Sequence, residues 1–308
     1  METNEKWFFD RLAPCRQFGH LIEGEIYKGK TAFQEVQILK SRAFGKILTL
    51  DGDLQSTQFD EYIYHETLVH PAMFACSSPE KVLIIGGGEG ATLREVLKHR
   101  SVRHAVMVDL DRELIKICKD YLPEWSKNAF HDKRVTQVFQ DAKEYLLNTE
   151  ETFDVIISDL VEPLPDSPAR FLVTKEFYEL IKSKLSDKGI FVMQASMAGA
   201  RDNFLHSVFY RTLSSVYSRV FSLGVFIPSY CNRWGFIIAS DDMSLSFSGE
   251  DLQRKIEERI EGELSFYDCE AHREIFSLIK PLRLAIEKQT GIFTESDTTL
   301  LSEPHRFV

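Results

Sequence analysis

Four acidic residues stand at the ends of four predicted strands and are the side chains best placed for chemistry. Glu89 lies in the glycine-rich turn 86–90, Asp109 and Asp141 follow the next two apolar runs, and Asp159 ends a fourth run. The carboxyl ends of neighbouring parallel strands meet at one edge of a sheet, where α/β proteins bind their ligands. We therefore expect these four carboxylates to line one site.

The glycine-rich turn predicts a nucleoside ligand. Gly86 and Gly88 let the backbone approach a ligand closely because they carry no side chain. Asp109 follows the turn at about the spacing at which an acid binds ribose hydroxyls. The pair Asp141-Ala142 suits an adenine amino group, although an acid at this position could equally cap the helix that follows.

Glu89 indicates which kind of nucleoside binds. The turn lacks the Gly-Lys-Ser/Thr ending of a phosphate-binding loop, and a glutamate would repel a pyrophosphate, so a sulfonium nucleoside fits better. S-adenosylmethionine brings its own carboxylate, and two like charges a few ångströms apart cost about 1–4 kcal/mol. Decarboxylated S-adenosylmethionine ends in an ammonium group, which Glu89 would attract. The residue therefore favours aminopropyl transfer; the alternative is an S-adenosylmethionine-dependent methyltransferase on the same fold.

The elements that position these acids form an alternating pattern from residue 81 onward. Apolar runs at 82–85, 105–109, 135–139, 153–158 and 189–194 predict strands, and helices are expected at 91–99, 112–121, 142–147, 174–185 and 203–217. This alternation predicts an α/β fold with a doubly wound, Rossmann-type parallel sheet. Residues 220–227 and 234–240 are expected to close it as an antiparallel pair, and residues 250–290 to be helical and to pack against it.

The N-terminal part has a different pattern. Polar and apolar residues alternate over short stretches at 18–27, 32–40, 46–50 and 54–59, separated by glycine-containing turns. This predicts a small antiparallel β module over residues 1–63, followed by a helix at 60–74 and a catalytic α/β domain over 64–308.

Composition excludes several classes of protein. The net charge of −10 and the pI of about 5.5 argue against a nucleic-acid partner, and no segment resembles a signal peptide or a membrane span. The five cysteines are scattered without a metal-binding spacing, so reduced thiols, no metal and a cytoplasmic location are expected. They are Cys15, Cys76, Cys118, Cys231 and Cys269.

The sequence resembles the polyamine aminopropyltransferases, a family that includes spermidine, thermospermine and aminopropylagmatine synthases. The resemblance covers about residues 30–240. Its stretches include Phe33-Gln34, Leu50-Asp51-Gly52 with Gln55, Tyr64-His65-Glu66, the glycine-rich turn, Asp109, Asp141-Ala142, Asp159-Leu-Val-Glu162-Pro163, and Tyr230 near Trp234. It implies a methyltransferase-like catalytic domain, a homodimer or homotetramer, and decarboxylated S-adenosylmethionine as co-substrate without a separate cofactor.

The resemblance also implies roles for individual residues. Gln34, Gln55, Glu89, Asp109 and Asp141 would bind the nucleoside. Asp159 would be the catalytic acid, with Tyr64 and Tyr230 lining the acceptor site and forming hydrogen bonds around it. His65, Glu162 and Trp234 would complete the acceptor site; the simpler alternatives are a structural His65, a solvated Glu162 and a core Trp234.

Two features separate this chain from common spermidine synthases. Those enzymes often have aspartate where Glu89 and Glu162 stand, and a proline where Cys231 stands. The longer Glu162 side chain reshapes the acceptor pocket, so putrescine, agmatine and spermidine all stay open as the acceptor. Arg94, on the helix after the turn, is expected to form an ion pair with a neighbouring element and not to contact a ligand.

Overall fold

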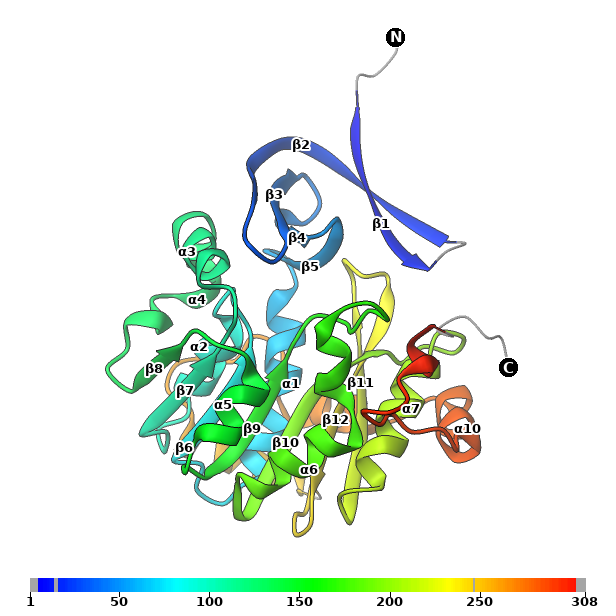
Figure 1. Cartoon of the computed structure of the whole chain (residues 1–308). Coiled ribbons are helices and arrows are strands. Elements are labelled where there is room, and N and C mark those ends of the chain that lie inside the picture. The colour runs from blue at the N-terminus through cyan, green and yellow to red at the C-terminus, as the bar shows by residue number, and fades with distance from the viewer. Residues whose placement is uncertain (1–4, 14–15, 246, 303–308) are drawn as a thin grey trace.

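The computed structural model describes residues 5–13, 16–245 and 247–302, and shows a small antiparallel sheet above a larger α/β unit (Figure 1). The small sheet has the order β1-β2-β3-β4-β5. Its strands are β1 (Lys6–Ala13), β2 (Arg16–Lys30), β3 (Glu35–Ser41), β4 (Gly45–Leu50) and β5 (Asp53–Thr57). The sequence predicted the last four but missed β1, an edge strand whose Trp7 and Phe9 are about half exposed.

The larger sheet has the order β11-β12-β10-β9-β6-β7-β8. Neighbours from β10 to β8 pair in parallel, while β12 and β11 pair antiparallel at the other edge. The predicted doubly wound sheet with a closing antiparallel pair is therefore confirmed. Its strands are β6 (Lys81–Gly86), β7 (His104–Val108), β8 (Val135–Val138), β9 (Phe153–Asp159), β10 (Leu185–Met197), β11 (Arg219–Ile227) and β12 (Asn232–Ser240).

Helices cover both faces of this sheet, because alternate residues of a strand point in opposite directions and the inner strands are apolar on both faces. On β6, Val82 and Ile84 belong to the apolar cluster that includes Leu68, whereas Leu83 and Ile85 belong to a second cluster. The helices are α1 (Glu61–Ala75), α2 (Ala91–Leu97), α3 (Arg112–Tyr121), α4 (Pro123–Ser126), α5 (Ala142–Asn148), α6 (Lys175–Ser183) and α7 (Phe204–Ser214). Short 3₁₀ turns occupy Ala129–His131, Pro168–Val173 and Thr299–Ser302.

Most predicted boundaries agree with the structure within a few residues. The largest difference is at the start of β10, which begins at Leu185 instead of residue 189. The expected domain boundary after residue 63 lies in the first turn of α1. Among the described residues, every helix is too short or too polar to cross a bilayer.

The described cysteines Cys76, Cys118, Cys231 and Cys269 are free thiols, as expected, and Cys15 lies outside the described residues.

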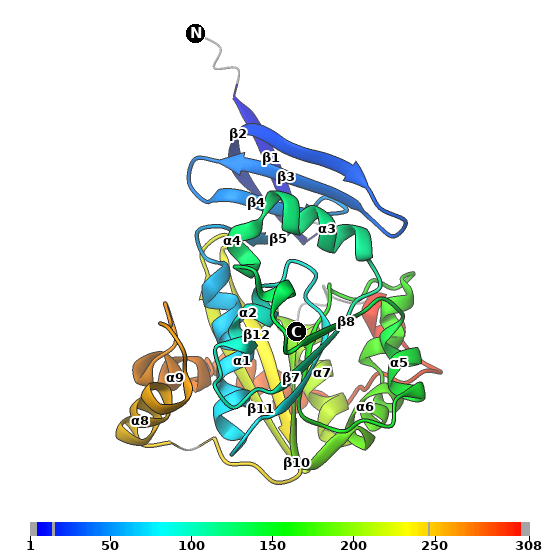
Figure 2. The same cartoon turned by 90° about the vertical axis from the view of Figure 1, so that its left-hand side faces the viewer.

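The C-terminal helices are α8 (Gly249–Arg259), α9 (Cys269–Phe276) and α10 (Lys280–Lys288), which confirms the helical prediction for residues 250–290. Figure 2 shows α8 and α9 beside α1, and α9 also contacts the edge strand β11, whereas α10 packs on α7. Glu66 of α1 fixes the segment before α9. Its fully buried carboxylate accepts the backbone N–H groups of Ser265, Phe266 and Tyr267 at 2.7, 2.8 and 2.8 Å.

We predict that Glu66→Gln destabilises the protein by about 2–4 kcal/mol, because the amide replaces one acceptor oxygen with a donor that faces backbone donors. Urea unfolding would measure the loss, and hydrogen exchange should accelerate at residues 265–267. The control is Glu80→Gln, whose carboxylate is 44% exposed and pairs with an exposed arginine; a change within about 0.5 kcal/mol is expected there. Equal effects of the two substitutions would contradict the role of Glu66.

Candidate active site

A cavity of about 470 Å³ opens where the carboxyl ends of β6, β7 and β9 meet the N-terminal sheet. Both sheets line it, which explains why residues far apart in the chain are needed to form it. The predicted site residues on its wall are Gln34, Gln55, Tyr64, Gly86, Gly88, Glu89, Asp109, Asp141, Ala142, Asp159, Glu162, Tyr230 and Trp234. The single predicted residue that is not on the wall is His65.

The glycine-rich turn is packed tightly against the end of β9. Gly86 and Gly87 have φ angles of +83° and +74°, a backbone conformation that favours glycine. A Cβ atom on Gly86 would lie 2.4 Å from the carbonyl oxygen of Asp159, and the Gly87 N–H donates to that oxygen at 3.0 Å. The turn and Asp159 therefore hold each other in place.

Asp159 is oriented by two hydroxyl donors. Its Oδ1 accepts a hydrogen bond from the Tyr64 hydroxyl at 2.8 Å, and its Oδ2 accepts one from Thr92 Oγ1 at 2.5 Å. Burial, followed by the charge of Glu89, raises the pKa of Asp159. Burial and the charge of Asp159 also raise the pKa of Tyr64, so this residue stays a protonated donor. Sequence analysis assigned no role to Thr92, although its place in the first turn of α2 was a signal.

Tyr230 lies on the turn between β11 and β12, and its hydrogen bond differs from the expected one. Its hydroxyl donates to the carbonyl oxygen of Gln55, not to the surroundings of Asp159. Asp60 fixes this turn by accepting bonds from the backbone N–H and the hydroxyl of Ser229 at 2.7 and 2.9 Å. The ring of Tyr230 meets the ring of Trp234 edge-on, with the two centroids 5.0 Å apart. Tyr230 therefore joins this end of the cavity to the N-terminal sheet.

At the other end, Asp109 lies directly after β7. Burial raises the pKa of Asp109 to about 7; a hydrogen bond from the Asp111 N–H at 2.8 Å opposes this shift. Asp111, missed by the sequence analysis, also lines the cavity and accepts bonds from Thr31 Oγ1 at 2.6 Å and Gln34 Nε2 at 3.0 Å. Asp141 caps α5 by accepting the N–H of Glu144 at 2.9 Å, which confirms the helix-cap alternative. It also lines the cavity, and its adenine-binding role stays a prediction.

His65 lies behind the wall, which corrects the expectation that it would contact the acceptor. The side chain is fully buried, with Nε2 3.0 Å from Glu89 Oε1 and Nδ1 2.9 Å from Glu61 Oε2. Arg94 binds both Glu61 oxygens, at 2.9 Å each, which confirms its expected ion pair. Burial lowers the pKa of His65, but the hydrogen bonds and charges of Glu61 and Glu89 outweigh it and raise the pKa to about 10.

Ligand atoms of His65, Glu89 and Asp159 lie within 4.8 Å of one another, a spacing that a metal ion could use. The imidazole Nε2, however, is directed at the Glu89 oxygen at 3.0 Å. When the imidazole is protonated it has no lone pair for a metal, and in that state the cluster is a charge-assisted hydrogen bond beside an acid.

Glu162 and Trp234 carry buried polar atoms without a hydrogen-bond partner, Oε1 and Nε1 respectively, and both residues line the cavity. Burial raises the pKa of Glu162; a hydrogen bond with Ser196 opposes the shift, and the charges of Asp53 and Asp10 add to it. Glu162 is partly exposed, but its Oε1 is buried, so that oxygen does not fit a fully solvated loop acid. Because buried polar groups are nearly always satisfied, these two atoms point to a ligand.

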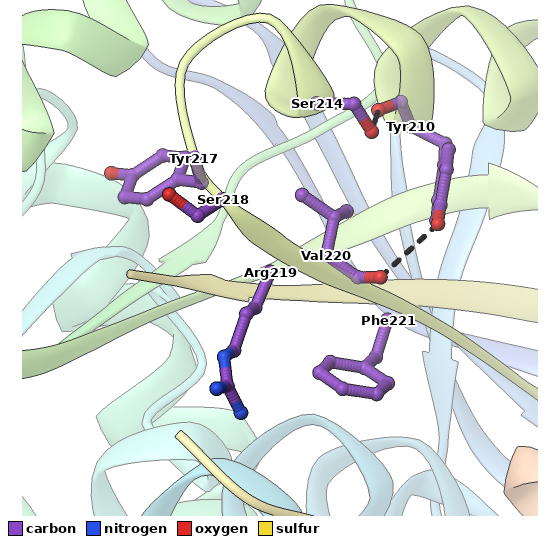
Figure 3. Close-up of a pocket in the computed structure, with 7 residues that line it drawn as sticks. All are labelled: Tyr210, Ser214, Tyr217, Ser218, Arg219, Val220 and Phe221. Carbon is purple, nitrogen blue, oxygen red and sulfur yellow. Dashed lines mark hydrogen bonds between the residues drawn. The ribbon is translucent and has the colours of Figure 1, made fainter. Parts of the chain in front are cut away.

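A second hollow, of about 450 Å³, lies between α7 and β11 and is lined by Tyr210, Ser214 and residues 217–221 (Figure 3). The Tyr210 hydroxyl donates to the Val220 carbonyl at 3.1 Å, and the Ser214 hydroxyl donates to the Tyr210 carbonyl at 2.8 Å. These polar groups are satisfied within the protein, so the first cavity is the candidate active site.

Known proteins resemble this chain over nearly all of its length. A family model described as spermine/spermidine synthase domain matches residues 61–248, and one described as spermidine synthase tetramerisation domain matches residues 6–58. A polyamine aminopropyltransferase from Sulfurisphaera tokodaii is 41% identical over 94% of this chain and 96% of its own, and one from Aeropyrum pernix is 42% identical over 96% and 95%.

Solved structures agree with these matches. A spermidine synthase from Thermotoga maritima aligns with a TM-score of 0.82, and a spermidine synthase in complex with the transition-state analogue AdoDATO aligns with 0.84. Each is 30% identical and covers 94% of this chain and 97% of its own.

The fold and the acid-lined cavity define a transferase with a methyltransferase-like domain. The chain belongs to the spermine/spermidine synthase family, which confirms the resemblance seen in the sequence.

Proposed function

We propose that the protein is a polyamine aminopropyltransferase, which moves the aminopropyl group of decarboxylated S-adenosylmethionine to an amine acceptor and releases methylthioadenosine. The observation that carries this proposal is Glu89, a carboxylate in the glycine-rich turn, on the wall of an enclosed cavity close to Asp159. Opposite charges attract strongly where water is excluded. The site therefore suits a ligand with both a sulfonium and an ammonium group. The family and the names of the relatives support the same reaction.

The nucleoside would occupy the end of the cavity nearest β7. Asp109 would accept ribose hydroxyls, Asp141 with Ala142 would meet the adenine, and Gly86 and Gly88 would let the ligand approach the turn. Gln34 and Gln55 would close the nucleoside from the N-terminal sheet. Gln34 is already held by Asp111 at 3.0 Å, so it needs little ordering on binding.

Asp159 would act on the attacking amine. An ammonium group has no lone pair, so a proton must leave before nitrogen attacks the carbon beside sulfur. As the nitrogen–carbon bond forms, the carbon–sulfur bond breaks and its electron pair neutralises the sulfonium. The proton passes to Asp159, directly or through water. Burial raises the pKa of Asp159 and makes it a better base, and Tyr64 with Thr92 fixes its direction.

Alignment of nitrogen, carbon and sulfur would supply much of the rate. Tyr64, Tyr230 and Trp234 would shape the acceptor channel, because the three side chains line the same cavity. Glu162 Oε1 is a buried acceptor without a partner, suited to the ammonium group at the far end of a di- or polyamine. The match of residues 6–58 to a tetramerisation domain supports a homo-oligomer.

A product assay tests the function as a whole. Purified protein would be incubated with decarboxylated S-adenosylmethionine and, separately, with putrescine, agmatine or spermidine, and the products measured by mass spectrometry. Each acceptor that is used should gain one aminopropyl group as methylthioadenosine appears in equal amount. Methyl transfer from S-adenosylmethionine, or tighter binding of that carboxylated nucleoside, would instead support a methyltransferase.

We predict that Asp159→Asn lowers turnover by at least about a hundredfold, the usual contribution of a positioned acid–base group. Binding of methylthioadenosine, measured by calorimetry, should change little. The control is Asp187→Asn, an exposed acid outside the cavity, which should keep normal turnover. Near-normal turnover in Asp159→Asn would refute the assignment.

We predict that Glu89→Gln weakens binding of decarboxylated S-adenosylmethionine by about 1–3 kcal/mol, the worth of a hydrogen bond to a charged group. Methylthioadenosine lacks the aminopropyl ammonium and serves as the matched ligand, so its affinity should stay within about twofold. An equal loss for both ligands would show that Glu89 supports the turn and does not bind the ammonium.

A further inference from the structure

His65 is buried between two carboxylates that belong to different elements of the fold. On the core side, Nδ1 is 2.9 Å from Oε2 of Glu61, four residues earlier in α1, and 2.6 Å from the Glu61 carbonyl oxygen. On the cavity side, Nε2 is 3.0 Å from Oε1 of Glu89 in the glycine-rich turn. His65 has no exposed surface, so a ligand in the cavity meets Glu89 and not the imidazole.

The core side of this contact is rigid. Arg94 of α2 binds both oxygens of Glu61 at 2.9 Å, and its Nε donates to Glu95 at 2.7 Å. The guanidinium also donates to the Trp125 carbonyl oxygen at 2.5 Å. A charged group held in this way has one orientation available to it. Glu61 therefore presents His65 to Glu89 with little freedom.

The cavity side needs a positive charge. Glu89 and Asp159 place oxygens within 4.8 Å of each other on the wall of the cavity, where both side chains are partly buried. Two carboxylates that share such a site repel, and one of them tends to take up a proton. The pKa of Asp159 is raised by burial and by the negative charge of Glu89, and it is lowered by the positive charge of His65. A neutral side chain at position 65 would leave the repulsion uncompensated.

We propose that His65 is a positioning residue, which holds the Glu89 carboxylate at the cavity wall and supplies the buried positive charge that Glu89 and Asp159 share. This inference rests on the proposed function, because the charge of His65 would offset the repulsion between the two acids that meet a cationic nucleoside. The ionisable groups around the imidazole are Glu61 and Tyr64 on α1, Glu89 on the turn, Asp159 on β9 and Arg94 on α2.

The charge on His65 can be measured in the wild-type protein. With ¹⁵N-labelled histidine, NMR should show the His65 ring as imidazolium at pH 8, identified by its contact with the Tyr64 ring, whose centroid is 4.9 Å away. The pKa raised to about 10 by Glu61 and Glu89, against the effect of burial, predicts loss of the proton only near that pH. A neutral His65 ring at pH 8 would overturn the proposal.

The effect on the reaction is tested by His65→Gln, which keeps a hydrogen-bond donor toward Glu89 but removes the charge. We expect the acid limb of the kcat/KM profile to move up by about one pH unit, because one pKa unit is a tenfold change in ionisation. Activity should fall by up to about tenfold at pH values below the acid limb and return to within about threefold of wild type at pH 9. A loss that is equal at every pH would indicate a merely structural role and overturn the proposal.

His70→Gln is the matched control. His70 lies on the same helix, is also fully buried, and also contacts a carboxylate, Glu95, at 3.1 Å. It faces His99 instead of the cavity, so its substitution should leave the acid limb unchanged. An equal shift in both variants would contradict a specific role for His65.

The two proposals fail in different ways. A wild-type protein that transfers no aminopropyl group to any acceptor would refute the proposed function, and the NMR titration would still decide the charge on His65. An active wild type with an unchanged acid limb in His65→Gln would refute the role of His65 alone.

Discussion

Negative charge inside an enclosed cavity is the constraint on which the rest of the site depends. Glu89 and Asp159 both line the cavity and are partly buried, and taking carboxylates out of water is costly unless other partners replace the water. The structure supplies different hydrogen-bond partners to each of the two carboxylates. Asp159 receives two hydroxyl hydrogen bonds, from Tyr64 and Thr92, and Glu89 receives the imidazole of His65. Hydroxyls orient an acid while leaving it able to accept a proton, whereas a charged imidazole stabilises the ionised form.

These partners work only if the two sheets keep their relative position. Polar bonds that join the sheets provide this. Asp111 binds Thr31 and Gln34, the Trp125 indole donates to the Ser56 hydroxyl at 3.0 Å, and Asp60 holds the turn that carries Tyr230. Because the sheet edge and the N-terminal module are bound together, the cavity between them stays enclosed and electrostatic interactions in it stay strong.

The sequence allowed the main acids to be placed because short, wholly apolar runs mark buried parallel strands, and a site must lie where such strands end. Strand β1 was missed because an edge strand with exposed aromatic residues has no clear alternation. The sequence likewise did not show whether the His65 side chain points toward the cavity or into the core. Residues 65–74 of α1 are buried all round, so helical periodicity does not tell which polar side chains face the cavity and which face the core.

Hydrogen-bond partners were the other part that sequence could not give. Tyr230 was expected beside Asp159 but bonds the Gln55 carbonyl, because the β11–β12 turn approaches β5 and is held there by Asp60. Such a contact depends on how a turn meets a strand about 175 residues away, which is a tertiary property. Asp111 and Thr92 did leave local signals, since Asp111 caps α3 and Thr92 lies in the first turn of α2. In sequence, however, a residue at the start of a helix looks the same whether it serves the helix or a site.

The charges around the turn explain why an imidazolium behind Glu89 is compatible with a cationic ligand. Three carboxylates (Glu61, Glu89 and Asp159) stand beside two basic side chains (His65 and Arg94), and Arg94 is shared with a fourth carboxylate, Glu95. His65 and Arg94 lie on the core side, and the carboxylates Glu89 and Asp159 lie on the cavity side. The electrostatic potential in the cavity is therefore negative. In the proposed reaction, decarboxylated S-adenosylmethionine would bring two positive charges to this place, whereas the intact nucleoside would add a carboxylate. A negative electrostatic potential would therefore discriminate between the two nucleosides by charge, without any steric barrier.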